Sequence, residues 1–351
     1  MAKRTNATLC AIDLFSGCGG LTLGLKQAGF DVVSAIEIDP IAANTFKANH
    51  PEVLVKQSDV RKISATALRR ELKIRRGQLD LLAGCPPCQG FSSLRTLNRA
   101  QRNRDPRNNL VHQMLRFAHA FRPKVVMMEN VPDLVRHKPF DDLCRGLEKL
   151  GYTVTFAIKD AARYGVPQRR RRLILLAGRG FKLQFPRESL RLRSVRGAIR
   201  HLAEPGRSRD ALHNIPEKKR LPRILRLIRD IPKDGGSRGD LPKRRQLRCH
   251  TKCDGFHDIY GRMAWDEVAP TITSGCFNPS KGRFLHPEKN RAITMREAAI
   301  LQSFPRDYVF DATVGKEAIA LMIGNALPPE FIRRHALEIH SLLSERAAKE
   351  K

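Results

Sequence analysis

The chain has 351 residues, 41% of them hydrophobic, which is enough to bury a sizeable core in one large or two smaller domains. Its 65 Lys and Arg residues outnumber 35 Asp and Glu, and the formal charge of +30 favours a polyanionic partner, most often nucleic acid. No apolar run is long enough for a membrane span or a signal-peptide core, so we expect a cytoplasmic protein whose eight cysteines are buried, ligating or reactive rather than disulfide-bonded.

Short apolar runs alternate with amphipathic stretches through the first half of the chain. The expected strands span residues 9–15, 32–38, 79–83, 124–128 and 173–177, and the expected helices span 21–28, 41–48, 65–72 and 110–121. Strands that alternate with helices predict βαβ units, and therefore an α/β fold with a mostly parallel sheet.

The pattern changes from about residue 185, where Pro, Gly, Arg and Lys become frequent and long periodic segments disappear. A disordered linker would have this composition, but apolar islands recur at 224–228, 263–265 and 269–272. We therefore expect a small irregular basic domain at 185–290 beside a first domain at 1–184. Helical patterning returns after Ala292, and residues 291–351 are expected to complete the first domain, with the terminal helix packed against it.

A glycine-rich loop, DLFSGCGG at residues 13–20, follows the first strand. It does not match the dinucleotide fingerprint, because Thr22 stands at the third glycine, and it lacks the Lys of a P-loop. Glu37 ends the second strand about twenty residues later, where a carboxylate accepts ribose hydroxyls. Asp59 in the third βα unit suits an adenine amino group. The set favours a nucleoside cofactor such as S-adenosylmethionine over NAD or ATP, although a glycine turn can also serve packing alone.

Two cysteines lie in GCPPCQGFS, residues 84–92, directly after a predicted buried strand. In open α/β sheets ligands bind at the carboxyl ends of the strands. Cys85 and Cys88 are compatible with a redox pair, with half of a zinc site, or with one nucleophile beside a bystander. The second half of a zinc site would have to come from residues whose spacing is irregular: Cys249, His250, Cys253 and His257.

Eight segments occur in the order found in one family: DLFSGCGG, IEIDP, SDV, GCPPCQGFS, MMENVP, QRRRRLILLAG, RAITMREAAILQSFP and GNALPP. On these segments the chain resembles the cytosine-5 DNA methyltransferases. The resemblance implies a Rossmann-like S-adenosylmethionine-dependent methyltransferase domain with a mixed, mostly parallel sheet, and a small irregular basic target-recognition domain at 185–290. It also implies double-stranded DNA as substrate, S-adenosylhomocysteine as product and no metal.

The resemblance further implies roles for individual residues. Cys88 is the expected nucleophile, with Glu129 and Arg170 binding the cytosine and Gln168 and Arg172 completing their motif, while Cys85 is a bystander. The cofactor residues are expected to be Phe15, Gly17, Cys18, Gly19, Gly20, Glu37, Ile38, Asp59, Val60, Pro87, Leu110 and Asn325. The DNA contacts are expected to be Gln89, Ser92, Arg95, Arg102, Thr271 and Thr273.

The chemistry of cytosine methylation accounts for these residue types. Carbon 5 of cytosine becomes nucleophilic when a thiolate adds at carbon 6, which is covalent catalysis by Cys88. The charge that develops needs an acid near N3, and Glu129 fits that role. A duplex hides carbon 6, so the base must be flipped out of the stack.

Several residues also have structural interpretations. Glu129 could cap a helix, and Thr271 and Thr273 could serve the fold rather than bind phosphates. At most two of Arg169–Arg172 can face inward on an extended segment, which favours Arg170 and Arg172. Trp265 could read DNA, but packing in the core of the small domain is the stronger expectation.

Two other functions remain open at this stage. One is the same chemistry on transfer RNA, since the fragment CHTKCDGF at 249–256 resembles a segment of a tRNA-modifying subfamily. The other is a DNA-binding module with a degenerate site. The interpretation we favour is a bacterial or phage enzyme that acts as a monomer, with or without a restriction endonuclease of the same specificity.

Overall fold

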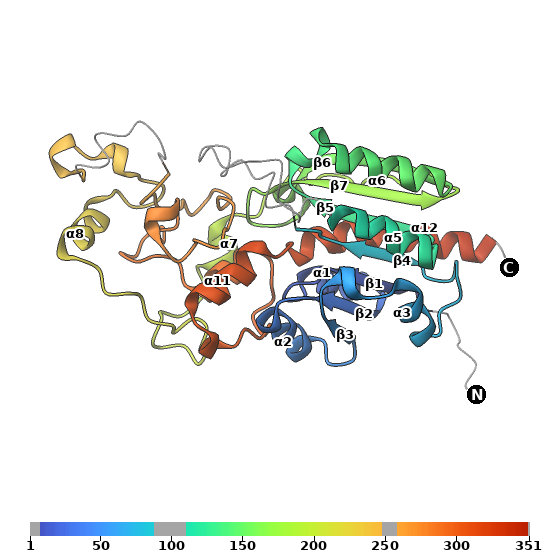
Figure 1. Ribbon diagram of the computed structural model, residues 1–351. Helices are drawn as coiled ribbons and strands as arrows, with labels where there is room; N and C mark the ends of the chain where they lie inside the picture. The colour runs from blue at the N-terminus through green and yellow to red at the C-terminus, as the bar shows by residue number, and fades with distance from the viewer. Residues whose placement is uncertain (1–7, 88–109, 248–257, 350–351) are drawn as a thin grey trace. The chain divides into compact units, whose positions relative to one another are not determined.

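The computed structural model describes residues 8–87, 110–247 and 258–349 (Figure 1). The chain divides into two compact units. Unit 1 comprises residues 1–164, 171–188 and 327–351, and unit 2 comprises residues 165–170 and 189–326. The chain thus leaves unit 1 and returns to it twice. Residues 291–326 belong to unit 2, whereas the terminal helix that follows them belongs to unit 1. Within unit 2, α10 (Met295–Leu301) packs on α7 (Val195–Ile199).

Unit 1 is built on a seven-stranded sheet in the order β3-β2-β1-β4-β5-β7-β6. Neighbouring strands are parallel except at β7, which is antiparallel to both β5 and β6. The mixed, mostly parallel sheet predicted from the sequence is therefore confirmed. The strands are β1 (Cys10–Leu14), β2 (Asp31–Glu37), β3 (Leu54–Gln57), β4 (Leu81–Gly84), β5 (Val125–Asn130), β6 (Tyr152–Asp160) and β7 (Arg171–Arg179).

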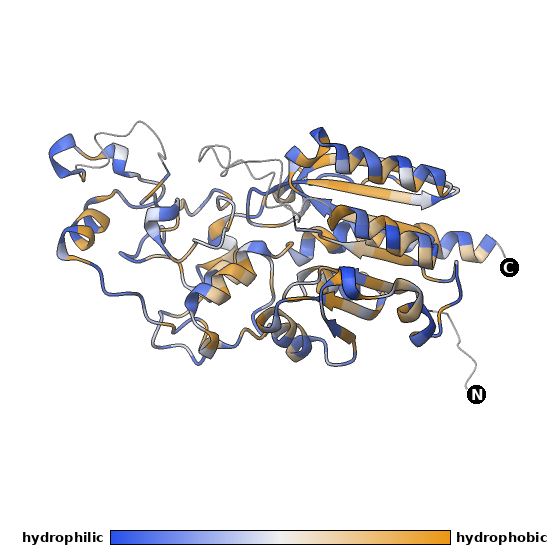
Figure 2. Cartoon of the chain, viewed as in Figure 1, coloured by the Kyte–Doolittle hydropathy of each residue, from blue (hydrophilic) through white to orange (hydrophobic). Residues whose placement is uncertain are grey.

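Helices cover this sheet and bury its apolar side chains. The helices of unit 1 are α1 (Gly20–Gln27), α2 (Pro40–Asn49), α3 (Ala65–Glu71), α5 (Val111–Phe121), α6 (Lys138–Lys149) and α12 (Pro329–Lys349). Helices α3, α5 and α6 share one apolar core with the central strands, in which Phe117, Phe121 and Phe140 are almost fully buried. Figure 2 shows the result, with apolar residues along the strands and polar residues on the outer faces of α5 and α6.

The terminal helix packs on α1 at a point where only glycine fits. A Cβ on Gly24 would lie 2.5 Å from the Pro329 carbonyl oxygen and 2.6 Å from Cβ of Ile332. The two helices therefore approach at the glycine backbone, and the expected packing of the terminal helix against the first domain is confirmed.

Two strands and one helix of unit 1 were not expected. The edge strands β3 and β6 carry exposed or half-exposed residues at most positions, so neither reads as a buried apolar run. Helix α6 contains several charged residues and buries only Phe140, Leu143 and Leu147. Their weak apolar signal explains why the sequence did not reveal them.

Unit 2 contains no strand within its described residues, only isolated bridges between extended segments. The described helices of unit 2 are α7, α8 (Pro222–Asp230), α10 and α11 (Lys316–Asn325), separated by loops and 3-10 turns. The 3-10 turns of unit 2 span Arg238–Asp240, Lys243–Arg245, Pro279–Lys281 and Ala312–Val314. A small apolar cluster forms around Ile228 and Tyr260, and Trp265 is buried as expected, with 8% of its surface exposed.

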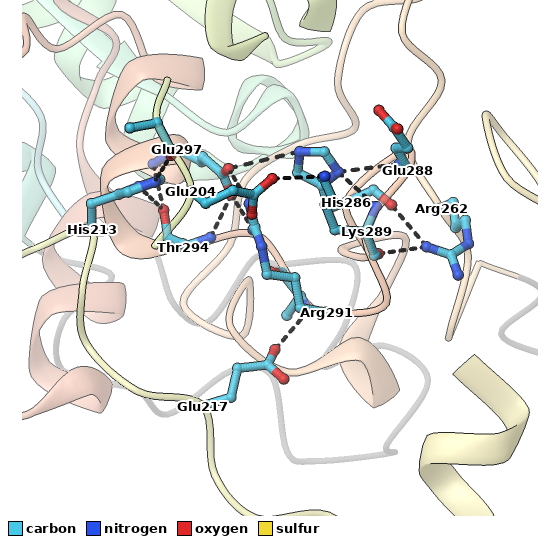
Figure 3. Close-up of polar contacts among 12 residues, drawn as sticks. Glu204, His213, Glu217, Arg262, His286, Glu288, Lys289, Arg291, Thr294 and Glu297 are labelled. Carbon is cyan, nitrogen blue, oxygen red and sulfur yellow. Dashed lines mark hydrogen bonds and ion pairs between the residues drawn. The ribbon is translucent and has the colours of Figure 1, made fainter. Parts of the chain in front are cut away.

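Buried charged side chains connect the loops of unit 2 (Figure 3). Arg262 is completely buried and donates hydrogen bonds to the carbonyl oxygens of Ile228, Ile231, His286 and Lys289 and to Oδ1 of Asn290. Buried carbonyl groups require hydrogen-bond donors. In this irregular backbone the Arg262 guanidinium supplies them, as the N–H groups of neighbouring strands do in a β-sheet.

A second part of this network surrounds the start of α10. Glu297 is buried and accepts two hydrogen bonds from the Arg291 guanidinium, each 2.8 Å long. It also completes a capping box with Thr294, whose hydroxyl lies 2.8 Å from Nδ1 of His213. Glu217 accepts from the backbone N–H of Ala292 at 2.6 Å. Side-chain interactions thus fix the turn that begins α10.

None of the helices in the described part of the chain has the length and apolarity needed to cross a bilayer.

Candidate active site

The glycine-rich loop joins β1 to α1 at the carboxyl edge of the sheet. Phe15 takes a left-handed backbone conformation with φ 64°, which is uncommon for a residue with a side chain. The N–H of Ser16 then bonds the Ile36 carbonyl oxygen at 3.0 Å, and Gly19, with φ 97°, is the N-cap residue of α1. The loop is therefore held across the end of β2.

Glu37 lies under this loop and holds it in place. One carboxylate oxygen accepts from the N–H of Gly17 at 2.7 Å, and the other accepts from the N–H of Asp39 at 2.8 Å. Burial raises the pKa of Glu37, and these backbone hydrogen bonds partly offset that rise. Each oxygen keeps a second lone pair, so the carboxylate retains acceptors for a further ligand.

The surroundings of Gly17 fit a ligand above the loop. Among the described residues, no atom lies within 4 Å of a Cβ placed at Gly17, so they leave open space over the backbone there. Ile38, next to Glu37, has 63% of its surface exposed. Asp59 follows β3 and caps a 3-10 turn that begins at Val60, which is buried. Arg61 pairs with Asp59 at 2.5 Å and lowers the pKa of that carboxyl.

The loop is supported from below by a pair that the sequence analysis did not identify. Asp13 is completely buried on β1 and accepts a hydrogen bond from the Thr22 hydroxyl at 2.7 Å. Burial raises the pKa of Asp13 to about 7. The bond connects the strand before the loop to the helix after it. The sequence signal that could have revealed this hydrogen bond was Thr22, which stands where the dinucleotide fingerprint has its third glycine.

The cysteine-containing turn begins at Gly84, the last residue of β4. A Cβ there would lie 2.7 Å from the Met114 sulfur and 2.9 Å from the Leu14 carbonyl oxygen, so only glycine fits. Beyond it, the side-chain amide of Asn130 donates to the Pro86 carbonyl oxygen at 3.0 Å. Asn130, a residue the sequence analysis passed over, thus connects the end of β5 to the proline turn. The sequence signal for this contact was an asparagine directly after Glu129, at the end of a predicted strand.

Glu129 and Arg172 form a largely buried ion pair beside this turn. Nε of Arg172 lies 2.7 Å from Oε1 of Glu129, and the two side chains are 16% and 10% exposed. Glu129 stands near the end of β5 and is paired with Ile174 of the antiparallel strand β7. Arg172 lies two residues before Ile174, so it is a diagonal neighbour of Glu129 on the same face of the sheet. The Glu129 side chain therefore belongs to strand β5 and this ion pair, and it caps no helix in the described part of the chain.

Cys85 also contacts this pair. Burial, followed by the negative charge of Glu129, raises the pKa of the Cys85 thiol well above its ordinary value. The thiol hydrogen-bonds the Glu129 carboxyl. A thiol held in its protonated form is a poor nucleophile, because the thiolate is the reactive species.

The arginine run alternates as an extended segment requires. Arg169 and Arg171 are exposed, Arg170 is buried, and Arg172 is half-buried. Arg170 lies in unit 2, where its guanidinium donates to the carbonyl oxygens of Ile272 and Gly324 at 3.1 and 3.0 Å. Its described bonds therefore hold backbone together.

Gln168 has a similar position in unit 2. It is completely buried, accepts from the N–H of Ile272 at 2.7 Å and donates to Oε1 of Gln302 at 2.8 Å. Gln302 in turn donates to the carbonyl oxygens of Ile323 and Ala326. Two amide side chains thus connect the 168–170 segment, the 271–273 segment and the end of α11.

The remaining predicted residues are placed as follows. Thr271 donates its hydroxyl hydrogen to the Arg169 carbonyl oxygen at 2.7 Å, and Thr273 accepts from the N–H of Gly275 at 3.3 Å, so both have structural bonds.

Asn325 ends α11 with its surface exposed, and Leu110 lies in the core of unit 1. Cys18 is buried, and burial raises its pKa to about 12. Gly20 begins α1, and Pro87 is half-buried.

Several predicted residues lie outside the described part of the chain. They are Cys88, Gln89, Ser92, Arg95 and Arg102, as well as the four candidate zinc ligands between Cys249 and His257. Among the described residues, no group of three or more His, Cys, Asp or Glu side chains is arranged to hold a metal ion.

The fold and this site define a class: an α/β domain with a nucleoside-type glycine loop and a carboxylate–guanidinium pair at the carboxyl edge of its sheet. The family model described as C-5 cytosine-specific DNA methylase matches residues 9–341. The chain belongs to this family.

Two bacterial proteins are among the relatives that share this resemblance. The chain is 34% identical to the type II methylase M.HgiDII of Herpetosiphon aurantiacus, over 95% of both chains. It is also 34% identical to the type II methyltransferase M1.HphI of Haemophilus parahaemolyticus, over 92% of this chain and 84% of that one.

Solved structures show the same architecture. A protein encoded within an E. coli prophage and described as a DNA modification methyltransferase superposes with a TM-score of 0.69 at 26% identity, covering 96% of this chain and all of that one. The Dnmt2 methyltransferase of S. pombe matches with a TM-score of 0.61 at 19% identity, over 97% and 99% of the two chains, and supports the fold alone.

Proposed function

We propose that the protein methylates carbon 5 of cytosine in a specific sequence of double-stranded DNA, with S-adenosylmethionine as methyl donor. The observation that carries this proposal is the Glu129–Arg172 pair beside the proline turn. It sets an acid and a cation at the sheet edge where the chain runs from Cys85 toward Cys88.

In this proposal Cys88 is the nucleophile that adds to carbon 6 of a flipped-out cytosine. Glu129 contacts N3 and the exocyclic amino group, and supplies the proton that neutralises the charge developing on the ring. Arg172 orients the carboxyl through its bond to Oε1. Loss of the proton from carbon 5 and elimination of Cys88 then restore the ring.

The methyl donor supplies an electrophilic carbon on a sulfonium. The residues that would hold it are those around the open space at Gly17, with Glu37 accepting from ribose hydroxyls. Asp59 would accept from the adenine amino group in addition to its bond with Arg61. Phe15, Gly19, Ile38, Val60, Pro87, Leu110 and Asn325 would complete the site. Burial favours the neutral form of Glu37, and the two N–H donors favour the charged form that accepts hydrogen bonds.

Arg170 and Gln168 take a different part in this proposal. Their bonds to backbone groups of unit 2 make them positioning residues for the segments around Ile272 and Gly324. Residues 185–290 serve target recognition, with Gln89, Ser92, Arg95 and Arg102 as further DNA contacts. The relatives are named a type II methylase and a type II methyltransferase, and we propose that this protein serves in a restriction–modification system in the cytoplasm of a bacterium.

Bisulfite sequencing of host DNA after expression tests the function and reads the recognition sequence together. We expect protection of cytosines at one short sequence. Transfer of label from S-adenosylmethionine is compared between plasmid DNA and total tRNA in parallel. Label found in tRNA alone would overturn the DNA assignment, and label in neither would leave the degenerate binding module as the better description.

A further inference from the structure

A second cationic site lies at the amino end of β5, whereas Glu129 and the proposed catalytic residues lie at its carboxyl end. Lys124 directly precedes β5, and Glu129 stands five residues further along the same strand, so the two positions are about 16 Å apart. Arg179 ends the antiparallel strand β7, and its N–H bonds the Lys124 carbonyl oxygen at 2.9 Å. Both side chains therefore belong to the edge away from the methylation site.

These residues line a cavity of about 140 Å³ in unit 1. The other lining residues are Phe181, Leu343, Arg346 and Ala347, the last three contributed by α12. Three of the six lining side chains are cationic and none is acidic. Such a site has the size and sign for one tetrahedral anion such as a phosphate group.

The three cations are held in place but keep donors for a ligand. Arg179 donates from Nη1 to the Arg122 carbonyl oxygen at 2.7 Å and from Nη2 to the Gly77 carbonyl oxygen at 3.1 Å. A guanidinium has five N–H groups, so three remain. Arg346 lies over the Phe181 ring at 4.4 Å, which orients it without using its N–H groups.

Little negative charge balances this cluster. Lys124 pairs with Asp80 at 2.9 Å, and Asp80 also accepts from the backbone N–H of Cys10. Among the described residues, Arg179 and Arg346 form no ion pair with a carboxylate. The site therefore keeps an excess of positive charge that an anion would neutralise.

Exposed basic residues extend this charge beyond the cavity. Arg75 and Arg76 are exposed just before Gly77, whose carbonyl accepts from Arg179, and Lys182 is exposed next to Phe181. A single small anion needs only the cavity, whereas positive charge that continues beyond the cavity suits a chain of phosphates. The chain's charge of +30 and its DNA substrate point to the same occupant.

We infer that this site binds a backbone phosphate of a second duplex segment, separate from the segment that holds the target cytosine. The contact carries no sequence information, because it involves phosphate and not base edges. It would keep the enzyme on long DNA while the catalytic edge engages one site after another. This role goes beyond the methylation reaction and does not depend on the residues assigned to it.

The test compares Arg346→Ser with the matched control Lys47→Ser, which removes one exposed positive charge from α2 in the same unit. Binding of the full chain to a short duplex and to a duplex several times longer is measured across a salt series. For Arg346→Ser on the long duplex we expect several-fold weaker binding and a log–log salt slope smaller by about 0.9, the value for one lost phosphate contact. Binding to the short duplex, and methyl transfer at saturating genomic DNA, should stay unchanged.

Further measurements separate the alternatives. Circular dichroism on heating confirms that the variant is folded, and Phe181→Leu, which removes the ring beneath Arg346, should give a smaller loss on the long duplex only. Equal losses for Lys47→Ser, equal losses on both duplexes, or no loss at all would each overturn the proposal. So would saturable calorimetric binding of inorganic phosphate that Arg346→Ser abolishes while the DNA salt slope is kept, since the cavity would then serve a small ligand.

Discussion

The two units of this protein are stabilised by different interactions. Unit 1 buries the apolar faces of a seven-stranded sheet and its helices, and hydrogen bonds between strands satisfy its backbone. Unit 2 has no strand among its described residues, and buried polar side chains such as Arg262, Gln168 and Gln302 bond its backbone carbonyls instead. Irregular backbone can be buried only where side chains supply the missing donors.

This difference separates two tasks. The regular unit holds the glycine loop, Glu37 and the Glu129–Arg172 pair at the ends of strands, where the sheet fixes their positions. The irregular unit consists mostly of loops, whose course depends on a small number of buried polar contacts. Changes on the surface of those loops leave the contacts intact, which suits the target recognition that we propose for residues 185–290.

The largest effect that we expect is on catalysis in unit 1. Cys88→Ala should lower methyl transfer by at least about a thousandfold, because the covalent route is lost. Cys85→Ala is the matched control and should keep most activity, since its thiol stays protonated beside Glu129. Initial rates with labelled cofactor measure both. Loss of activity in Cys85→Ala with retention in Cys88→Ala would reverse the assignment.

The next largest effect concerns the buried guanidinium of unit 2. Arg262→Met would leave four backbone carbonyls without their donor, which we expect to destabilise unit 2 by about 3–5 kcal/mol. Hydrogen exchange should become faster in α8 and α10 while β4 and β5 stay protected.

The control for Arg262 lies in unit 1. Arg116 on α5 donates to the carbonyl oxygens of Val60 and Ile63, but its side chain is only half-buried. Arg116→Met should cost about 1 kcal/mol, because water can reach the carbonyls it leaves. If Arg262→Met were no more damaging than Arg116→Met, polar side chains would not be what holds unit 2 together.

A smaller effect is expected from acid. Burial lowers the pKa of His286 to about 4, and its Nδ1 accepts from the N–H groups of Glu288 and Lys289, an acceptor role that protonation would end. The unfolded chain, with an ordinary histidine pKa of about 6.5, binds a proton at a higher pH than the folded chain does. Stability contributed by His286 is therefore full above pH 6.5 and lost as pH falls toward 4.

The expected loss for unit 2 is about 2 kcal/mol between pH 7 and pH 5. Comparison with His286→Gln isolates it, because glutamine keeps an acceptor without titrating. Glu297, Arg291, Glu204 and Glu288 face His286 and are common to both proteins. His50 and His335 in unit 1 also have pKa values lowered to about 4 by burial, so exchange of α10 amides is the appropriate readout. Equal pH dependence in the variant would exclude His286 as the source.

The buried parts of the sheet could be predicted from the sequence because local patterns determine them. Continuous apolar runs predicted β1, β2, β4, β5 and β7, and Glu37 stands at the end of β2, where the sequence placed it. Its contact with the Gly17 N–H was not predicted. The edge strands β3 and β6 were missed because every residue of β3, and every residue of β6 except Tyr152, is exposed or half-buried. Alternation along the extended segment also predicted that Arg170 and Arg172 would face inward.

The sequence by itself determined the fold class, the family and the order of the motifs, since each depends on residues close together in the chain. Only the tertiary structure decided the partners: Arg172 with Glu129, Arg170 with Ile272 and Gly324, Asn130 with Pro86, and Lys124, Arg179 and Arg346 around one cavity. These residues come together from positions up to 222 apart in the numbering, Lys124 to Arg346. The physical reason is that such contacts depend on how strands and helices pack, which local periodicity does not encode.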